Sequence, residues 1–134
     1  MNVVLDTNVL VSALWSPGRK PGEIVTAAIA GRFTLCYDFR ILDEYERVLR
    51  YPGFRFQDWE IRALLEPLVN NGISVVAEPL PQVPFTDESD RKFYEVARFC
   101  NAPLVTGNLA HFPPDPLVMS VARFYGLYIQ ESYY

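Results

Sequence analysis

Three acidic residues lie far apart in this sequence at positions where an α/β protein brings side chains together. Asp6 follows the apolar run at 3–5, Glu44 lies within the helical pattern ILDEYERVLR, and Asp90 lies near the start of DESDRKFYEVARFC. Carboxylates without a histidine or cysteine cluster form a hard, all-oxygen site, which suits Mg²⁺ or Mn²⁺. One or two such ions turn a water into a nucleophile and stabilise charge on a phosphodiester. These residues therefore indicate metal-dependent hydrolysis.

Helical phase and charge pairing select two of these acids from their neighbours. At 100° per residue, Asp90 lies about 70° from the centre of the buried face of its helix. Asp87 lies about 130° away and is better explained as the helix cap. Glu46 has Arg50 at i+4, the favourable order for a surface ion pair, whereas Glu44 has a valine there. We therefore favour Glu44 and Asp90 as the site acids.

Short apolar runs alternate with helical patterns along the whole chain. Strands are predicted at 3–5, 33–37, 73–78, 103–107 and 116–120. Helices are predicted from about residue 8, at 21–31, 41–50, 58–72 and 87–100, with a final helix or turn at 121–128, and Pro67 should kink or end its helix. Strands that alternate with helices imply parallel pairing. We predict one α/β domain over residues 1–134, a three-layer α/β/α sandwich around a mainly parallel sheet of about five strands.

The predicted topology places Asp6 near a second strand end. Ligands of an open α/β sheet bind beyond the carboxyl ends of the strands, where the strand order reverses. Asp6 ends the first strand, and Thr106, Gly107 and Asn108 end the strand at 103–107. If these strands are neighbours, as a doubly wound order allows, their ends lie about 5 Å apart. Asp6 then serves a site at this edge, the alternative being a purely structural role as a helix N-cap.

Four segments of the chain resemble the PIN-domain family of metal-dependent ribonucleases, in its VapC-type, toxin-like branch. VLDTNVLVSAL resembles the opening strand with the first acid, and ILDEYERVLR resembles the helix with the family's Glu. DESDRKFYEVARFCNAPLVTGN resembles the segment with the third acid and the strand-end motif. The resemblance implies catalysis and metal binding by Asp6, Glu44 and Asp90, with Asn108 as a further metal ligand. It implies supporting roles for Thr7, Asn8 and Thr106.

The resemblance also implies an activity and partners. The expected activity is an endoribonuclease, a hydrolase that cleaves single-stranded RNA with Mg²⁺ or Mn²⁺. The expected partners are a small antitoxin protein and a second copy of the chain. Neither a signal peptide nor a membrane span is expected, because the apolar run of MNVVLD lacks a preceding basic region and residues 99–114 contain prolines. Cys36 and Cys100 suit small buried thiols in a reducing cytoplasm.

Two residues near the fourth predicted strand leave the assignment open. Many family members have Asp where this chain has Asn108, and Asn keeps an oxygen ligand but loses a charge, which weakens metal affinity. A catalytically weakened PIN-fold module that binds RNA or protein is therefore the alternative function, and the net charge of −4 also favours it. His111 suits a general acid or a phosphate contact, but we expect a loop histidine that bonds backbone.

The remaining chemical alternatives have less support. A phosphatase with Asp6 as nucleophile is disfavoured, because DTN lacks the second acid of the DxDxT pattern typical of the haloacid-dehalogenase family. Ten of the twelve basic residues are arginines, which pair bidentately with phosphate. Arg19 and Lys20 suit a grip on an RNA backbone, although a solvated turn explains them equally well.

Overall fold

The computed structural model describes residues 1–130, and a five-stranded parallel sheet lies at the centre of this part of the chain. Every adjacent pair of strands in the order β3-β2-β1-β4-β5 is parallel, with β1 in the middle. The predicted α/β fold with a parallel sheet of five strands is confirmed. The strands are β1 (Asn2–Leu5), β2 (Thr34–Tyr37), β3 (Ile73–Ser74), β4 (Leu104–Thr106) and β5 (Val118–Ser120).

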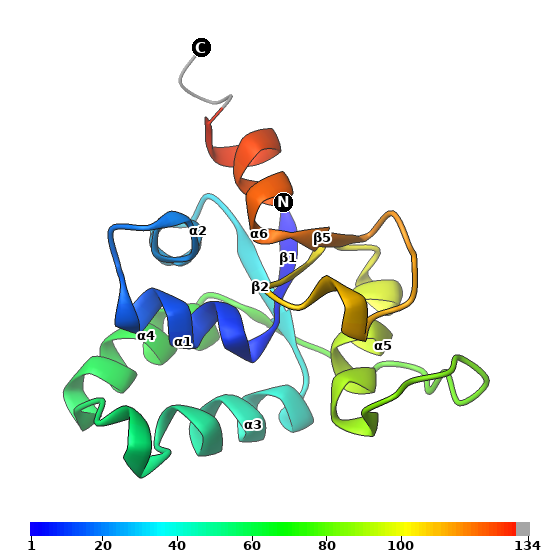
Figure 1. Cartoon of the computed structure of the whole chain (residues 1–134), viewed down its shortest axis with the longest axis horizontal. Helices are drawn as coiled ribbons and strands as arrows, with labels where there is room; N and C mark the ends of the chain where they lie inside the picture. Colours follow the sequence, from blue (N-terminus) through cyan, green and yellow to red (C-terminus); the bar gives the residue numbers. More distant parts are fainter. Residues whose placement is uncertain (131–134) are drawn as a thin grey trace.

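Six α-helices in residues 1–130 pack around this sheet. In Figure 1, α1, α2 and α4 lie to the left of β1 and β2, α5 lies to the right, and α3 runs along the bottom of the view. Short 3-10 turns precede α4 and α5 and follow β4, and a π-helical turn follows α6. The helices are α1 (Thr7–Trp15), α2 (Lys20–Ile29), α3 (Phe39–Leu49), α4 (Asp58–Asn70), α5 (Arg91–Cys100) and α6 (Val121–Tyr125).

Burial of the central strand explains its composition. Val3, Val4 and Leu5 of β1 are completely buried. A parallel strand covered on both faces needs apolar side chains on both, and so its sequence is a continuous apolar run without alternation. Asp6, which directly follows β1, is also buried. The carboxylate is therefore placed at the end of a rigid, fully packed strand.

Two element boundaries differ from the prediction. The strand predicted at 73–78 is only Ile73–Ser74, an exposed edge strand that pairs with β2 alone and is soon followed by prolines that cannot donate backbone hydrogen bonds. The helix predicted at 58–72 does not end at Pro67 but continues through it to Asn70. Its apolar face is buried, and this packing compensates for the one hydrogen bond that Pro67 cannot donate.

The structure also bears on the expectations for the two cysteines and for a membrane span. Cys36 is a buried free thiol, as predicted, whereas Cys100 at the end of α5 is only partly buried. Among residues 1–130, none of the helices combines the length and the apolar character that a membrane crossing requires.

Candidate active site

The central pair of strands brings Asp6 and Thr106 together at the carboxyl edge of the sheet. In β1 and β4, Leu5 lies opposite Val105, and the backbone amide of Asp6 donates to the Val105 carbonyl at 2.9 Å. The Thr106 hydroxyl donates to Asp6 Oδ2 over 2.8 Å. The predicted proximity of these two strand ends is therefore present.

Asn8 links the first turn of α1 to the turn that follows β4. Its side-chain oxygen accepts a hydrogen bond from the Gly107 amide at 3.0 Å, and its Nδ2 donates to Asp6 Oδ2 over 3.3 Å. The amide of Asn108 donates to the Thr106 hydroxyl over 2.9 Å. Asp6 occupies the N-cap position of α1, but its side chain makes no capping hydrogen bond. Its carboxylate is thus held by Thr106 and Asn8, and the capping alternative does not explain its position.

Helix α3 brings Glu44 to the same edge. The Thr7 hydroxyl donates a short hydrogen bond to Glu44 Oε2, and Lys92 Nζ of α5 lies 2.7 Å from Glu44 Oε1. The next residue, Tyr45, is completely buried, and its hydroxyl donates to the carbonyl oxygen of Leu5. This bond fixes α3 against the end of β1, directly before Asp6, and so determines where Glu44 lies.

The two neighbouring acids that the sequence excluded make the surface contacts predicted for them. Glu46 pairs with Arg50 at 3.2 Å along the outside of α3. Asp87 caps the short turn before α5, where its Oδ1 accepts from the Ser89 amide at 2.9 Å. Charge pairing and helical phase therefore separated the surface acids from those that face the sheet edge.

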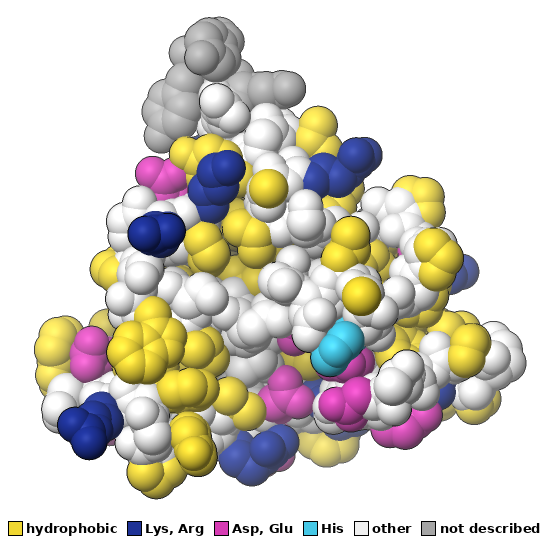
Figure 2. Space-filling view, in the orientation of Figure 1, with side chains coloured by type: hydrophobic (Ala, Val, Ile, Leu, Met, Phe, Trp, Pro, Cys, Tyr) yellow, Lys and Arg dark blue, Asp and Glu magenta, His cyan; other side chains and the backbone are white. Residues whose placement is uncertain are grey.

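Asp90 completes the acidic edge at the start of α5. Its Oδ2 is buried without a hydrogen-bond partner, and Nδ1 of His111 lies 3.4 Å away. The His111 ring also contacts Asn108, with Nδ2 of Asn108 3.2 Å from Nδ1 and 3.1 Å from Nε2. The expected bond from this ring to backbone is therefore wrong, because the turn after β4 directs the ring toward side chains. Figure 2 shows acidic side chains gathered beside the single histidine.

Burial and the charges of neighbouring acids raise the pKa of Asp6 and of Asp90. Burial raises the pKa of Asp6 to about 6, the hydrogen bond from Thr106 opposes this shift, and the charges of Asp90 and Glu44 add to it. Burial also raises the pKa of Asp90, as do the charges of Asp87 and Glu44. Like charges in one poorly solvated site disfavour joint ionisation unless a cation balances them.

The donor chemistry of this site fits a hard divalent cation, although the ligands are not preassembled. Over residues 1–130, no group of three or more His, Cys, Asp or Glu side chains is arranged to hold a metal ion. Both carboxylate oxygens of Glu44 are engaged within the chain, one by Thr7 and the other by Lys92. The unpartnered Asp90 Oδ2 and the raised pKa of Asp6 are nevertheless what a site that accepts a cation should show.

Lys92 is a site contact that was not predicted from the sequence. This side chain is largely buried, with 12% of its surface exposed, and it contacts a predicted site acid directly. Its position about 90° from the centre of the buried face of α5 is the only signal in the sequence, and that phase equally suits a solvated flank. Its partner Glu44 lies on another helix, so no local spacing predicts the pair.

A second group of buried acids, the Asp38–Arg40–Glu95 network, lies near the first. Asp38 caps α3 by accepting from the Ile41 amide at 3.0 Å, and Arg40 lies 2.7 Å from Asp38 and 2.8 Å from Glu95. The second oxygen of Glu95 accepts from the Leu80 amide at 2.7 Å. Both buried carboxylates therefore have charged and neutral donors, and the network joins α3, α5 and the loop before α5.

Comparison with known proteins finds a family model that matches most of this chain. The family model of the PIN domain matches residues 2–110, a segment that contains all the predicted site residues. A search among curated proteins finds no match for the chain.

Proposed function

Since the chain belongs to the PIN-domain family, whose members are generally nucleases, we propose that it is a metal-dependent endoribonuclease acting on single-stranded RNA. The observation that supports this proposal is the electrostatic coupling at the carboxyl edge of the sheet, where burial raises the pKa of Asp6 to about 6 and the charges of Asp90 and Glu44 add to that shift. The proposed reaction is hydrolysis of a phosphodiester bond with Mg²⁺ or Mn²⁺.

Each residue of the edge has a proposed role. Asp6 and Asp90 would hold the cation, Glu44 would act directly or through water, and Asn108 would contribute a neutral oxygen. When bound, such a cation lowers the pKa of a water ligand and stabilises charge on the phosphodiester. The supporting residues orient these ligands, because Thr106 and Asn8 hold Asp6 in place and Thr7 holds Glu44.

Replacement of one carboxylate tests this proposal. Asp6→Asn keeps the shape of the side chain but removes the charge that attracts a cation, and metal-dependent cleavage of single-stranded RNA should fall at least about 100-fold. Glu46→Gln is the matched control, since it removes a carboxylate of the same helix as Glu44 that pairs with Arg50 at the surface. Unchanged cleavage by purified Asp6→Asn protein would refute the nuclease proposal.

A catalytically weakened binding module is the second candidate. Two observations favour it: an Asn stands at position 108, and the acids in residues 1–130 form no preassembled metal site. Titration calorimetry with Mn²⁺ separates the candidates. Binding at millimolar metal or below supports the nuclease, and its absence favours the binding module.

We also propose that the nuclease acts in the cytoplasm as the toxin of a toxin–antitoxin pair, as a homodimer that a small antitoxin protein inhibits. The support is the resemblance of its four sequence motifs to the VapC-type branch. Induced expression should then arrest growth with the natural sequence and not with Asp6→Asn. Coexpression of a small protein encoded directly upstream should restore growth, and light scattering should give the mass of two chains.

A further inference from the structure

A hollow of about 520 Å³ lies between α3 and the start of α5, next to the candidate active site. Its lining includes four basic side chains, two acidic ones and Phe39. The lining therefore carries a formal charge of about +2, in a chain whose net charge is −4. Asp38, Glu95 and Glu44 lie outside this lining and balance Arg40 and Lys92, so an anionic ligand needs a cation of the hollow that is not already held by such a partner.

Arg47 is the least engaged cation of this hollow. Arg40 belongs to the Asp38–Arg40–Glu95 network, and Arg91 forms an ion pair with Glu88 at 2.7 Å. Arg47, in contrast, is 67% exposed, and the ion pair that it forms with Asp43 is long, at 4.0 Å. An incoming phosphate can replace so weak a contact at little cost, since exposed pairs of this kind contribute about 0–1 kcal/mol.

Phe39 supplies an apolar surface beside this arginine. It is the first residue of α3, and 79% of its surface is exposed. Phe39, Asp43 and Arg47 are spaced by four residues, so they follow one another along one side of the helix. The exposed ring therefore lies on the same side as the guanidinium, where a planar ligand with a phosphate would contact both.

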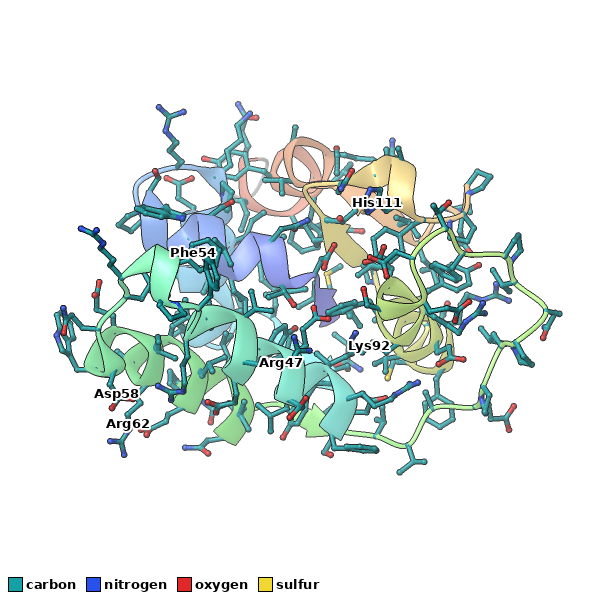
Figure 3. All side chains as sticks on the ribbon, turned by 60° about the horizontal axis from the view of Figure 1, so that its bottom comes forward. Arg47, Phe54, Asp58, Arg62, Lys92 and His111 are labelled. Carbon is teal, nitrogen blue, oxygen red and sulfur yellow. The ribbon has the colours of Figure 1, made fainter. Side chains whose placement is uncertain are left out.

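Lys92 connects the hollow to the acidic edge. It lines the hollow, and its Nζ lies 2.7 Å from Glu44 Oε1. Figure 3 shows Lys92 and Arg47 near one another on α5 and α3, with Asp58 and Arg62 at the distant end of the molecule. A ligand in the hollow is thus one side chain away from the carboxylates.

We propose that this hollow binds a nucleotide of single-stranded RNA next to the bond that is cleaved, with its phosphate on Arg47 and its base against Phe39. The identity of the substrate rests on the proposed function, whereas the binding site rests on the hollow itself. An unpaired strand offers a phosphate and a stacking face at each nucleotide. An acidic peptide would satisfy the arginine but leave the aromatic ring without a planar partner.

Binding without cleavage tests the site. The probe is a short fluorescein-labelled single-stranded RNA in EDTA, and the readout is fluorescence anisotropy. Arg47→Gln should raise Kd about 5- to 10-fold and lower the salt slope by about 0.7, and Phe39→Ala should raise Kd about 5-fold or more. Arg47→Lys, which keeps the charge, should recover part of the affinity.

Two matched controls lie on α4. Arg62→Gln removes an arginine that is 61% exposed, and Trp59→Ala removes an aromatic ring that is 70% exposed. Both should leave Kd within about twofold of the parent protein, because neither residue lines the hollow. Thermal melts of all variants should coincide with that of the parent, since each altered side chain is largely exposed.

Three results would overturn the inference: Kd values for Arg47→Gln and Phe39→Ala equal to those of the controls, no RNA binding by the parent protein, or binding of a poly-glutamate peptide in preference to RNA. The measurement needs no catalysis. Full cleavage by Asp6→Asn would refute the proposed function without changing these binding constants, and so the two failures are distinguishable.

Discussion

Two groups of buried or partly buried acids lie around Tyr45, and they differ in how their charge is balanced. In the Asp38–Arg40–Glu95 network, a guanidinium contacts both carboxylates, and backbone amides satisfy further oxygens. At the candidate active site, burial and the charges of neighbouring acids raise the pKa of Asp6 and of Asp90, and Asp90 Oδ2 has no hydrogen-bond partner.

This difference distinguishes acids that stabilise the fold from acids that are proposed to bind a metal ion. A buried carboxylate costs free energy unless it is paired and hydrogen-bonded. The Asp38–Arg40–Glu95 network meets this condition with residues of the chain, so it needs no ligand and joins three elements. The acidic edge meets it only in part, through Lys92 and the hydrogen bonds from Thr106, Asn8 and Thr7. The remaining repulsion is what a divalent cation would relieve. Damage to the network should therefore reduce stability, and removal of an edge acid should increase it.

The largest expected effect on stability is the loss caused by Arg40→Met. This change leaves Asp38 and Glu95 buried without their cation, and breaking such a pair costs about 3–5 kcal/mol. We expect about 3 kcal/mol, at the low end, because the Arg40 side chain is 37% exposed. The free energy of unfolding in urea at neutral pH measures it. Arg62→Met is the control, since its partners Asp58 and Glu66 are exposed, and it should lose no more than about 1 kcal/mol. Equal losses of unfolding free energy in Arg40→Met and Arg62→Met would show that the network contributes no more stability than surface ion pairs.

The next effect is a pH dependence of stability in metal-free protein. Burial raises the pKa of Asp6 from 3.8 to about 6, so the folded state binds this proton more tightly than the unfolded state. The stability that the proton contributes is complete below about pH 4 and is lost as the pH rises through about 6. The loss should amount to roughly 2–3 kcal/mol, at 1.36 kcal/mol for each pKa unit.

Asp6→Asn isolates this contribution, because it removes the titrating group and the repulsion with Asp90 and Glu44. In EDTA, the variant should be the more stable protein at pH 7, and its advantage should shrink toward pH 4. Urea unfolding across this range measures the difference, with Glu46→Gln as the control that removes a surface carboxylate. An Asp6→Asn protein that is less stable than its parent at pH 7 would show that the edge acids do not repel one another.

The sequence predicts an acid whose signals are local, and it does not predict contacts that join distant parts of the chain. Asp6 is predictable because it ends an apolar strand, and Glu44 is distinguished from Glu46 because Arg50 lies four residues further along the same helix. Arg40 and Glu95 are 55 positions apart, and only the packing of α3 against α5 joins them. Local pattern therefore predicts the edge acids, and tertiary packing alone creates the network.

The secondary-structure elements and the basic surface residues also show that local sequence patterns do not reveal tertiary contacts. The alternation of apolar runs and helical patterns predicts the parallel sheet, but it overestimates β3, because an edge strand has a partner on one side only. The basic residues Arg19 and Lys20 were noticeable as neighbours in the sequence. Arg47 and Lys92 became candidates only when the fold placed them in one hollow.

The smallest predicted effect concerns Asn108, the position at which the sequence predicts weakened metal binding. Asn108→Asp adds a carboxylate beside Asp6 and Asp90, and a further anionic ligand should tighten binding of Mn²⁺ about tenfold, or about 1.4 kcal/mol. Without metal, the same change adds a like charge and should lower stability. Calorimetry with Mn²⁺ measures the gain. Asn71→Asp is the control for net charge, because Asn71 lies just before β3, at the opposite edge of the sheet. Equal Mn²⁺ affinity in Asn108→Asp and the parent would mean that position 108 does not face the cation, and the acidic edge would then have to bind metal through Asp6, Glu44 and Asp90 alone.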